Sequence, residues 1–246
     1  MINKKKIKKF VDALDLKSGE TIIEIGPGHG ELTTGIKHRV LSIKIVAIEK
    51  DEKFVQLLRK KFALDKNIEI IEGDALKILK SYTLHLKSYK IVGNIPFYIT
   101  GYLFRVLSEL KNKPSLIVFF LQKEVAQRIC AIPPKMNLLA ASVQFWAKPE
   151  IISYISQKDF RPMPKVDSAI VKLETRDKRQ ETKNAEKYYK FIKILFKQPR
   201  KTILNNLKPL AATELISQKL KLSGVSSRAR PQNLNIEQLQ QLSTLF

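Results

Sequence analysis

Short apolar runs alternate with amphipathic segments along the first 175 residues. Runs rich in isoleucine, valine and phenylalanine predict seven strands, over Thr21–Ile25, Lys44–Glu49, Ile68–Gly73, Tyr89–Gly93, Ser115–Leu121, Val143–Tyr154 and Ser168–Glu174. Helical spacing of apolar residues predicts helices between them, including Phe54–Phe62, Leu103–Leu110 and Glu124–Ile132. Strands separated by helices are typical of βαβ units, so we expect a mostly parallel α/β sheet with covered faces. The later strands follow one another closely, which favours an antiparallel pair at one edge.

The pattern changes after residue 175. Residues Thr175–Asn184 are polar and charged without an apolar period, which is typical of a linker. Apolar positions then recur at helical spacing over Tyr188–Phe196. Further helices are expected over Lys201–Leu207, Thr213–Leu222 and Ile236–Leu245, with Asn235 as an N-cap. The sequence therefore predicts a domain over 1–175, a linker over 176–184 and a small all-helical domain over 185–246.

The charge of the chain is strongly positive. Its 246 residues, enough for a substantial core, contain 45 Lys and Arg against 23 Asp and Glu, a net charge of +22. Residues 175–246 carry 15 Lys and Arg against 5 Asp and Glu, so the basic excess is concentrated near the C-terminus. A lysine-rich composition alone would give the same sign. A polyphosphate partner nevertheless selects this charge, and nucleic acid is the leading partner.

Other features point to a cytoplasmic protein without a membrane span or a metal. No stretch approaches the roughly 18 apolar residues of a spanning helix, and Met1–Lys9 lacks the apolar core of a signal peptide. The single cysteine, Cys130, excludes an intrachain disulfide, which fits a reducing compartment. The three histidines show no metal-ligand spacing with Cys130, so we expect no metal site.

A glycine-rich turn follows the first predicted strand. The segment Glu24–Gly30 has the spacing G-x-G-x-G, whereas the spacing G-x-G-x-x-G seats a pyrophosphate on a helix N-terminus. Glycines at a strand-to-helix turn let the backbone approach a ligand closely, although a tight turn alone would also explain them. Gly26 and Gly28 are therefore candidate cofactor-binding positions, and the spacing argues against a nicotinamide dehydrogenase.

Two carboxylates stand at the ends of the next predicted strands. Glu49 ends the second strand about 20 residues beyond the glycines, where a carboxylate can accept hydrogen bonds from both ribose hydroxyls. Asp74 follows the third strand, where it can accept from an adenine amino group. Either residue alone could be an ordinary solvated carboxylate. Three strand ends in this order suit a nucleoside without a diphosphate, as in S-adenosylmethionine.

The tetrapeptide Asn94-Ile95-Pro96-Phe97 follows the fourth predicted strand. An amino nitrogen conjugated to an aromatic ring is a poor nucleophile, so a site that methylates it needs acceptors for its hydrogens and a flat surface for the ring. The Asn94 amide oxygen and the carbonyl before Pro96 can accept, Pro96 makes the backbone rigid, and Phe97 offers a stacking surface. A strand end with ordinary turn residues would explain the same four letters.

These segments resemble the motifs of a known family. EIGPGHGELT, IEKD, GDAL and VGNIPFYIT are similar to the motifs of the rRNA adenine N6-dimethyltransferases, the KsgA/RsmA and Erm group. FFLQKEVAQRI, DFRPMPKVDSAIVKL, FKQPRKTILNNL and SRARPQNLNIEQLQQL extend the resemblance over nearly the whole chain. The PxPxVDSA and RKT-NNL segments resemble the KsgA/RsmA branch, which methylates small-subunit rRNA, more than the Erm branch. Ile95 and Phe97 distinguish the two branches less clearly, because Leu and Tyr are common at these two positions in the KsgA/RsmA branch.

The resemblance implies a Rossmann-like, S-adenosylmethionine-dependent methyltransferase domain and a small helical C-terminal domain that helps to grip RNA. It places Gly26 and Gly28 at the methionine end of the cofactor, Glu49 at its ribose and Asp74 at its adenine. It places Asn94 near the transferring methyl group. It also gives Phe160 the position of a second aromatic that would sandwich the target base with Phe97, although burial in the core would equally explain this residue.

One departure from the family concerns the N-terminus. Family members usually begin with a basic stretch and a G-Q-N-F-L-like segment whose Asn and Leu touch the cofactor, and Met1 would fall at that Leu. A misassigned start, a truncated chain or a protein without this contact would each explain the difference, and the last would weaken cofactor binding.

The expected activity is direct in-line methyl transfer to N6 of an adenine, twice per base, by a monomer acting on an unstacked adenine in small-subunit rRNA, within the subunit or its precursor. Catalysis would then rest on positioning by Asn94, Pro96, Phe97 and Phe160. Two alternatives remain: an Erm-type enzyme acting on large-subunit rRNA, and a non-catalytic rRNA-binding assembly factor. Phosphate contacts are expected from Lys4–Lys9 and from Arg200, Lys201, Arg228 and Arg230, although the first run is also typical of a solvated helix face.

Overall fold

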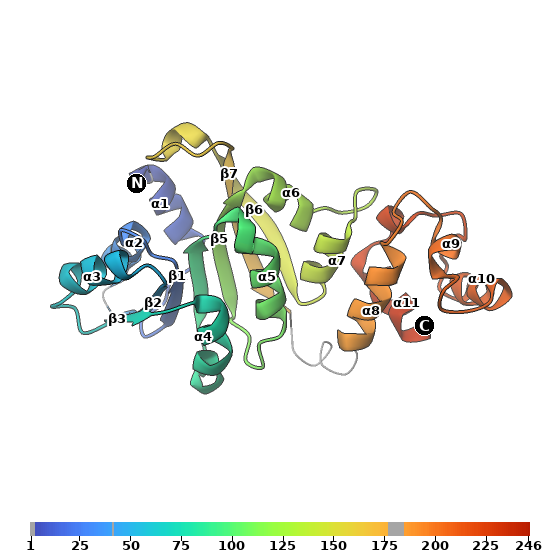
Figure 1. The fold of residues 1–246 in the computed structure, drawn as a ribbon, viewed down its shortest axis with the longest axis horizontal. Helices are drawn as coiled ribbons and strands as arrows, with labels where there is room; N and C mark the ends of the chain where they lie inside the picture. Colours follow the sequence, from blue (N-terminus) through green and yellow to red (C-terminus); the bar gives the residue numbers. More distant parts are fainter. Residues whose placement is uncertain (1–2, 41, 177–184) are drawn as a thin grey trace. The chain divides into compact units, whose positions relative to one another are not determined.

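The computed structural model describes residues 3–40, 42–176 and 185–246 (Figure 1). Within these ranges seven strands form one sheet: β1 (Thr21–Ile25), β2 (Lys44–Glu49), β3 (Ile68–Glu72), β4 (Lys90–Asn94), β5 (Leu116–Gln122), β6 (Ala147–Ile155) and β7 (Ser168–Thr175). Their order across the sheet is β3-β2-β1-β4-β5-β7-β6. The first five strands pair in parallel, and β7 runs antiparallel to β5. The predicted α/β sheet with antiparallel pairing toward one edge is confirmed.

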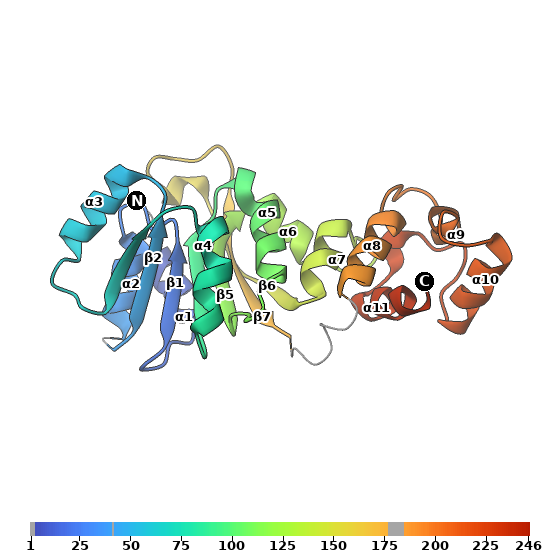
Figure 2. The ribbon, with the colours of Figure 1, turned by 60° about the horizontal axis from the view of Figure 1, so that its bottom comes forward.

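Helices cover both faces of the sheet. Those before and between the first five strands are α1 (Lys4–Asp12), α2 (Glu31–Arg39), α3 (Glu52–Lys61), α4 (Ala75–Tyr82) and α5 (Phe97–Ser108). After β5 the chain forms α6 (Lys123–Ile129) and α7 (Leu138–Gln144), and there are short 3₁₀ turns η1 (Thr83–His85) and η2 (Gln157–Asp159). Figure 2 shows α4 and α5 in front of the sheet and α1 behind it. This arrangement explains why the parallel strands are apolar on both sides.

The central strand β5 shows how the two faces are filled. Val118 and Phe120 belong to a buried cluster with residues of α1 and α2, and the Phe120 ring stacks on Phe10 at a centroid distance of 4.4 Å. Phe119 points to the other face, where its ring meets Phe104 of α5 edge to face at 6.4 Å. Successive side chains of a strand alternate between faces, so one strand anchors both helical layers.

The predicted strand over Val143–Tyr154 begins too early. Residues 143 and 144 form the last turn of α7, and β6 starts at Ala147. Asn137 is the N-cap of α7, and its side-chain oxygen accepts a hydrogen bond from the Ala140 amide at 3.0 Å. Because Val143, Phe145, Trp146 and Ala147 are all apolar and buried, the hydrophobic pattern alone did not separate the end of α7 from the start of β6.

The described residues divide into two compact units. The first comprises Met1–Ala126 and Pro149–Thr175, and the second comprises Gln127–Lys148 and Arg176–Phe246. The sequence had placed residues 127–148 in the first domain, whereas the structure groups them with the C-terminal helices. Aromatic contacts explain this grouping, since the Phe145 ring stacks on Tyr188 at 4.1 Å and the Tyr188 hydroxyl donates to the Ala141 carbonyl at 3.0 Å. Of the predicted linker, residues 177–184 lie outside the described residues.

The rest of the second unit is helical, as predicted. Its helices are α8 (Ala185–Leu195), α9 (Ile203–Leu207), α10 (Thr213–Leu222) and α11 (Ile236–Leu245), with a 3₁₀ turn η4 (Pro231–Asn233). Asn235 caps α11 as expected: its side chain accepts from the Gln238 amide at 2.8 Å, and the Gln238 side chain accepts from the Asn235 amide at 3.1 Å. Across the part of the chain that the structure describes, no helix is long and apolar enough to cross a membrane.

Candidate functional site

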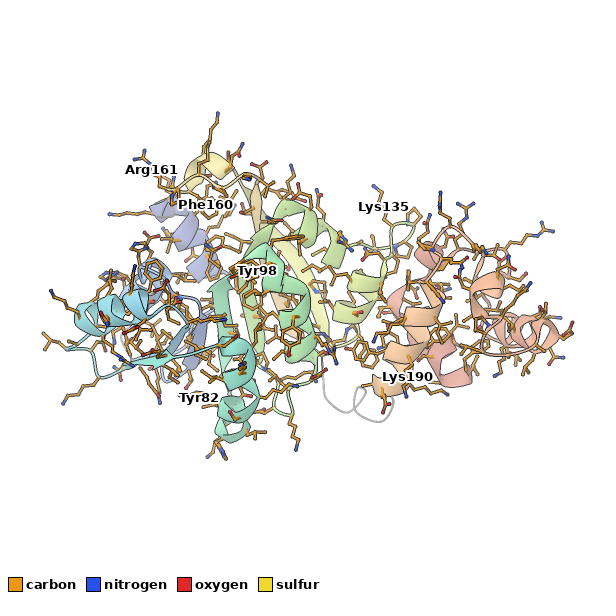
Figure 3. The ribbon with its side chains drawn as sticks, viewed as in Figure 1. Tyr82, Tyr98, Lys135, Phe160, Arg161 and Lys190 are labelled. Carbon is orange, nitrogen blue, oxygen red and sulfur yellow. The ribbon has the colours of Figure 1, made fainter. Side chains whose placement is uncertain are left out.

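A cleft opens at the carboxyl ends of β1, β4 and β5. Its volume is about 410 Å³, and it is lined by the glycine-rich turn, the Asn94–Phe97 segment, the end of β5 and the segment between β6 and β7. Figure 3 labels Phe160 and Arg161 in that last segment. Ligands of open α/β sheets bind at this edge, where the strand order reverses between β1 and β4.

The glycine-rich turn lies at the floor of the cleft because its backbone conformation suits glycine. Gly26 and Gly28 have φ angles of +63° and +55°, in the region that side-chain-bearing residues rarely adopt. A Cβ atom added at either position would meet nothing within 4 Å. Backbone strain, and not crowding within the chain, therefore accounts for glycine here, and the turn leaves open space above its backbone.

The Asn94–Phe97 segment presents acceptors and a ring to the same cleft. The Ile95 amide donates to the Phe120 carbonyl at 3.1 Å, which holds the segment on β5. Among the described residues, neither the Asn94 side-chain amide nor the Ile95 carbonyl has a hydrogen-bond partner, and Asn94 is exposed. Pro96 caps α5, and its carbonyl accepts from the Thr100 hydroxyl at 3.0 Å. The side chain of Phe97 is 61% exposed.

Phe160 lines the cleft from the segment between β6 and β7 while remaining part of the core. Its side chain is buried, and its ring meets Phe120 edge to face at a centroid distance of 6.2 Å. The backbone just before it is tied to the start of α1, because the Asn3 amide donates to the Asp159 carbonyl at 3.0 Å and the Asn3 side chain donates to the Asp159 carboxylate at 3.1 Å. Both expectations for Phe160, core burial and a place in the site, are compatible with this position.

Glu49, at the end of β2, is held by backbone amides. One carboxylate oxygen accepts from the Lys50 and Asp51 amides at 2.8 and 2.9 Å, and the other accepts from the Gly28 amide at 3.0 Å. The residue is buried. The last of these bonds connects the glycine turn directly to β2, so Glu49 adjoins the cleft although it does not line it.

Asp74 stands at the end of β3 and begins α4. One of its oxygens accepts from the Leu76 amide at 3.0 Å, which makes Asp74 the N-cap of the helix. The other oxygen lies 3.5 Å from the exposed ammonium group of Lys50. Asp74 does not line the cleft. The structure thus gathers Gly26, Gly28, Asn94 and the other predicted cleft residues around one cavity, with Glu49 beside it and Asp74 farther along the same sheet edge.

Glu24 is a cleft residue that the site prediction missed. It is fully buried at 1% exposure, and its carboxylate accepts from the Thr33 hydroxyl of α2 at 2.6 Å. Burial raises the pKa of Glu24 to about 7, although the hydrogen bond from Thr33 acts in the opposite direction. A glutamate in the strand just before the glycines was the available signal, but a single acidic residue within an apolar strand does not reveal that it faces a cavity.

The predicted phosphate contacts lie on exposed surface. Arg200, Lys201, Arg228 and Arg230 are exposed in the second unit. In α1 the basic run is mostly exposed as well, although Lys6 lies 3.5 Å from the Asp159 carboxylate and Lys9 donates to the Ser153 hydroxyl at 3.2 Å. Among the described residues, no group of three or more histidine, cysteine, aspartate or glutamate side chains could hold a metal ion.

The sequence profile of the family described as "Ribosomal RNA adenine dimethylase" matches residues 1–246. The chain belongs to this family. It is 36% identical to "Ribosomal RNA small subunit methyltransferase A" of Mycoplasma capricolum, an alignment that covers 98% of this chain and 92% of that protein. Members of the family are S-adenosylmethionine-dependent methyltransferases, so the chain is an enzyme of this class.

Two solved structures share the fold. A dimethyladenosine transferase from Plasmodium falciparum superposes with a TM-score of 0.81 at 24% identity, covering 98% of this chain and 95% of that one. The 23S rRNA methyltransferase ErmE superposes with a TM-score of 0.78 at 22% identity, covering 99% of this chain and 97% of that one. The predicted Rossmann-like methyltransferase fold with a helical C-terminal region is therefore confirmed.

The residues present fit a nucleoside cofactor. The open space above Gly26 and Gly28 admits a ligand against the backbone, and Glu49 stands where the glycine turn meets β2. A carboxylate fixed by three amides keeps its remaining lone pairs in a set direction, which suits the two hydroxyls of a ribose.

Proposed function

We propose that this enzyme transfers two methyl groups to N6 of each target adenine in small-subunit rRNA and takes part in maturation of that subunit. The observation that carries the proposal is the cleft itself, which is lined by Phe97, by Phe160 and by two acceptors that have no hydrogen-bond partner among the described residues, the Asn94 amide oxygen and the Ile95 carbonyl. The names of the curated relatives favour the small subunit as the site of action.

The proposed roles are those that the resemblance to the family implies, and the contacts described above are compatible with them. Gly26 and Gly28 line the methionine end of S-adenosylmethionine, Glu49 accepts from the ribose hydroxyls, and Asp74 accepts from the adenine amino group. S-adenosylmethionine, when bound, supplies an activated methyl group on a sulfonium, so no covalent enzyme intermediate is needed. What the chain contributes is position and electrostatics.

At the target base, Asn94 and the Ile95 carbonyl accept the amino hydrogens of an adenine and direct the nitrogen lone pair toward the cofactor side of the cleft. Pro96 keeps this acceptor pair rigid, because its φ angle is fixed and it begins α5. Phe97 stacks on one side of the base and Phe160 closes the other. An adenine can enter only when it is unstacked, in a loop or flipped out of a helix. The proton of the amino group leaves to solvent.

RNA outside the cleft is held by basic side chains. We expect Arg200, Lys201, Arg228 and Arg230 to contact phosphates, because they are exposed in a region of high positive charge. The enzyme would act as a monomer in the cytoplasm, on a small ribosomal subunit or its precursor.

Methyl transfer to isolated ribosomal subunits tests the proposal. Small subunits from a strain that lacks the modification should accept label from S-adenosylmethionine, and mapping of the rRNA should show dimethylated adenines. Label that appears only in large subunits would instead indicate an Erm-type enzyme. Absence of transfer, together with absence of S-adenosylmethionine binding in calorimetric titration, would indicate an rRNA-binding assembly factor.

A further inference from the structure

Three aromatic side chains are exposed together on α5. The exposed fractions of Phe97, Tyr98 and Tyr102 are 61%, 84% and 57%. Single exposed apolar residues are common on protein surfaces, but three on one turn and a half of helix form a patch. The opposite face of α5 is buried against the sheet, with Leu103, Phe104 and Leu107 at its centre. The solvent-exposed face of α5 therefore carries aromatic rings, whereas the exposed face of an amphipathic helix usually carries polar residues.

A glycine lies beside the two tyrosines. Gly101 is on the exposed face of α5, next to the pair Tyr98 and Tyr102, and a Cβ atom added there would meet nothing within 4 Å. No neighbouring side chain requires glycine at this position, and glycine weakens a helix interior relative to alanine. Its effect is to keep the helix surface low beside two phenol rings that are four residues apart, a separation of about 6 Å along the axis.

The two tyrosines have no role in holding the fold together. Within the described residues, neither hydroxyl forms a hydrogen bond and neither ring contacts another ring or a cation. Other exposed aromatics are engaged, as shown by Tyr154, whose ring lies 5.7 Å from the Lys123 ammonium group. The Tyr98 and Tyr102 rings therefore present free faces to solvent, and Figure 3 labels Tyr98 on α5.

We propose that Tyr98, Gly101 and Tyr102 form a stacking surface for a nucleotide next to the target adenine in single-stranded RNA, an inference that rests on the proposed function. The patch is continuous with the cleft, because Phe97 lines the cleft and Tyr98 is the next residue. A nucleotide joined to a base held at Phe97 must leave the cleft over adjoining surface. Aromatic rings stack on any base, so this contact adds affinity without reading sequence.

Charge supports a nucleotide as the occupant. The chain carries +22, and the exposed guanidinium of Arg105 lies one turn beyond Tyr102 on the same face of α5. This side chain also donates to Glu109 at 3.0 Å, so its charge is partly balanced. A base that stacks on a tyrosine thus has its phosphate near a cation, which combines the two contacts used in single-strand binding.

A fluorescent RNA tests the stacking directly. The probe is an oligouridylate with a single adenine and 2-aminopurine as the neighbouring base, titrated with the full-length protein. Stacking on a tyrosine ring should quench the fluorescence of 2-aminopurine and raise its fluorescence anisotropy, because the bound base rotates more slowly. Tyr98→Ala should remove the quenching and weaken RNA binding by about five- to a hundredfold, the range for loss of one base–aromatic stack. Tyr98→Phe should bind as the unchanged protein does.

Two further variants separate stacking from folding. Gly101→Leu replaces glycine by a better helix former in open space, so it should fold well yet obstruct the base and weaken RNA binding. Tyr154→Ala removes another exposed tyrosine, one that does not line the cleft, and should leave the fluorescence unchanged. Calorimetric titration with S-adenosylmethionine should give the same affinity for all variants.

The outcomes distinguish this inference from the proposed function. Unchanged fluorescence and RNA affinity in both Tyr98→Ala and Gly101→Leu would overturn the stacking surface even if methyl transfer to small subunits proceeds. Variants that bind the oligonucleotide normally but lose association with intact subunits would overturn it in favour of a protein partner. If quenching depends on Tyr98 but the protein transfers no methyl group, the result would support the stacking surface and contradict only the proposed function.

Discussion

The strand ends of the sheet differ in how far the chain satisfies their polar groups. At the ends of β2 and β3, Glu49 accepts three backbone hydrogen bonds and Asp74 caps a helix. At the end of β4, the Asn94 amide and the Ile95 carbonyl have no partner in the described part of the chain. The carboxylates of Glu49 and Asp74 are held by hydrogen bonds within the chain. The Asn94 amide and the Ile95 carbonyl are positioned only by the backbone that carries them.

This difference separates stability from function. A group that is already hydrogen-bonded within the chain stabilises the fold, so its replacement should weaken folding and ligand binding together. An unpartnered exposed group contributes little to folding, so its replacement should affect chemistry alone. Four substitutions test this contrast, and they differ in the size of the effect that we expect.

The largest effect is expected for Asn94→Ala. Loss of an acceptor for the target amino group should lower the rate of methyl transfer to small subunits by about a hundred- to a thousandfold, as for removal of one oxyanion-type contact. The free energy of unfolding in urea should change by less than about 0.5 kcal/mol, and rRNA affinity should remain. Asn205→Ala, which removes an exposed asparagine of α9, is the matched control. Full activity in Asn94→Ala would refute the assignment.

Glu24→Gln should stabilise the protein at high pH. The folded-state pKa is raised from 4.5 to about 7, so the folded chain binds the proton more tightly and stability falls as pH rises between these values. Gln cannot ionise, so its advantage over Glu24 should grow by about 2.5 kcal/mol between pH 5 and pH 8. Urea unfolding at both pH values measures this, with exposed Glu214→Gln as the control. An advantage that does not depend on pH would show that Glu24 ionises freely.

Glu49→Gln should weaken folding and cofactor binding together. A neutral amide has one acceptor oxygen, so at least one of the Gly28, Lys50 and Asp51 amides loses its partner. We expect a loss of about 2 kcal/mol in the free energy of unfolding and a lower affinity for S-adenosylmethionine. Glu72→Gln, at the exposed end of β3, loses only an ion pair with Arg59 at 3.7 Å and should change neither quantity. If Glu49→Gln and Glu72→Gln are equally stable, the hydrogen bonds of Glu49 do not stabilise the fold as proposed.

Of the two hydrogen-bonded strand-end residues, Glu49 and Asp74, replacement of Asp74 by alanine should have the smaller effect on folding. Loss of the cap to the Leu76 amide should reduce the free energy of unfolding by about 1 kcal/mol. Asp51 caps α3 in the same way, accepting from the Lys53 amide at 2.9 Å, so Asp51→Ala should cost the same. Calorimetry separates the two variants, because only Asp74→Ala should lower the affinity for S-adenosylmethionine. Equal cofactor affinities would remove Asp74 from the proposed site.

Local sequence signals placed most elements but not all of their ends. The glycine turn, the strand-end carboxylates and the Asn235 cap were predictable because each depends on neighbouring residues. Helix α5 was expected over Leu103–Leu110 but begins at Phe97, with Pro96 in the N-cap position. The segment Asn94–Phe97 was interpreted as a base-binding segment or a turn, and neither interpretation placed the start of a helix there. The exposed rings of Tyr98 and Tyr102 were hidden by that error, because only the true start of α5 shows which residues share its outer face.

The sequence by itself determined the order of strands and helices, the family motifs and the basic character of the chain, because periodicity and composition are properties of the chain. Only the tertiary structure decided which polar groups are satisfied and which are open. Glu24 is buried beside a cavity, residues 127–148 pack on α8, and Asn94 faces the cleft because distant segments come together around them. Hydrogen bonding and burial depend on these long-range contacts, which no local pattern encodes.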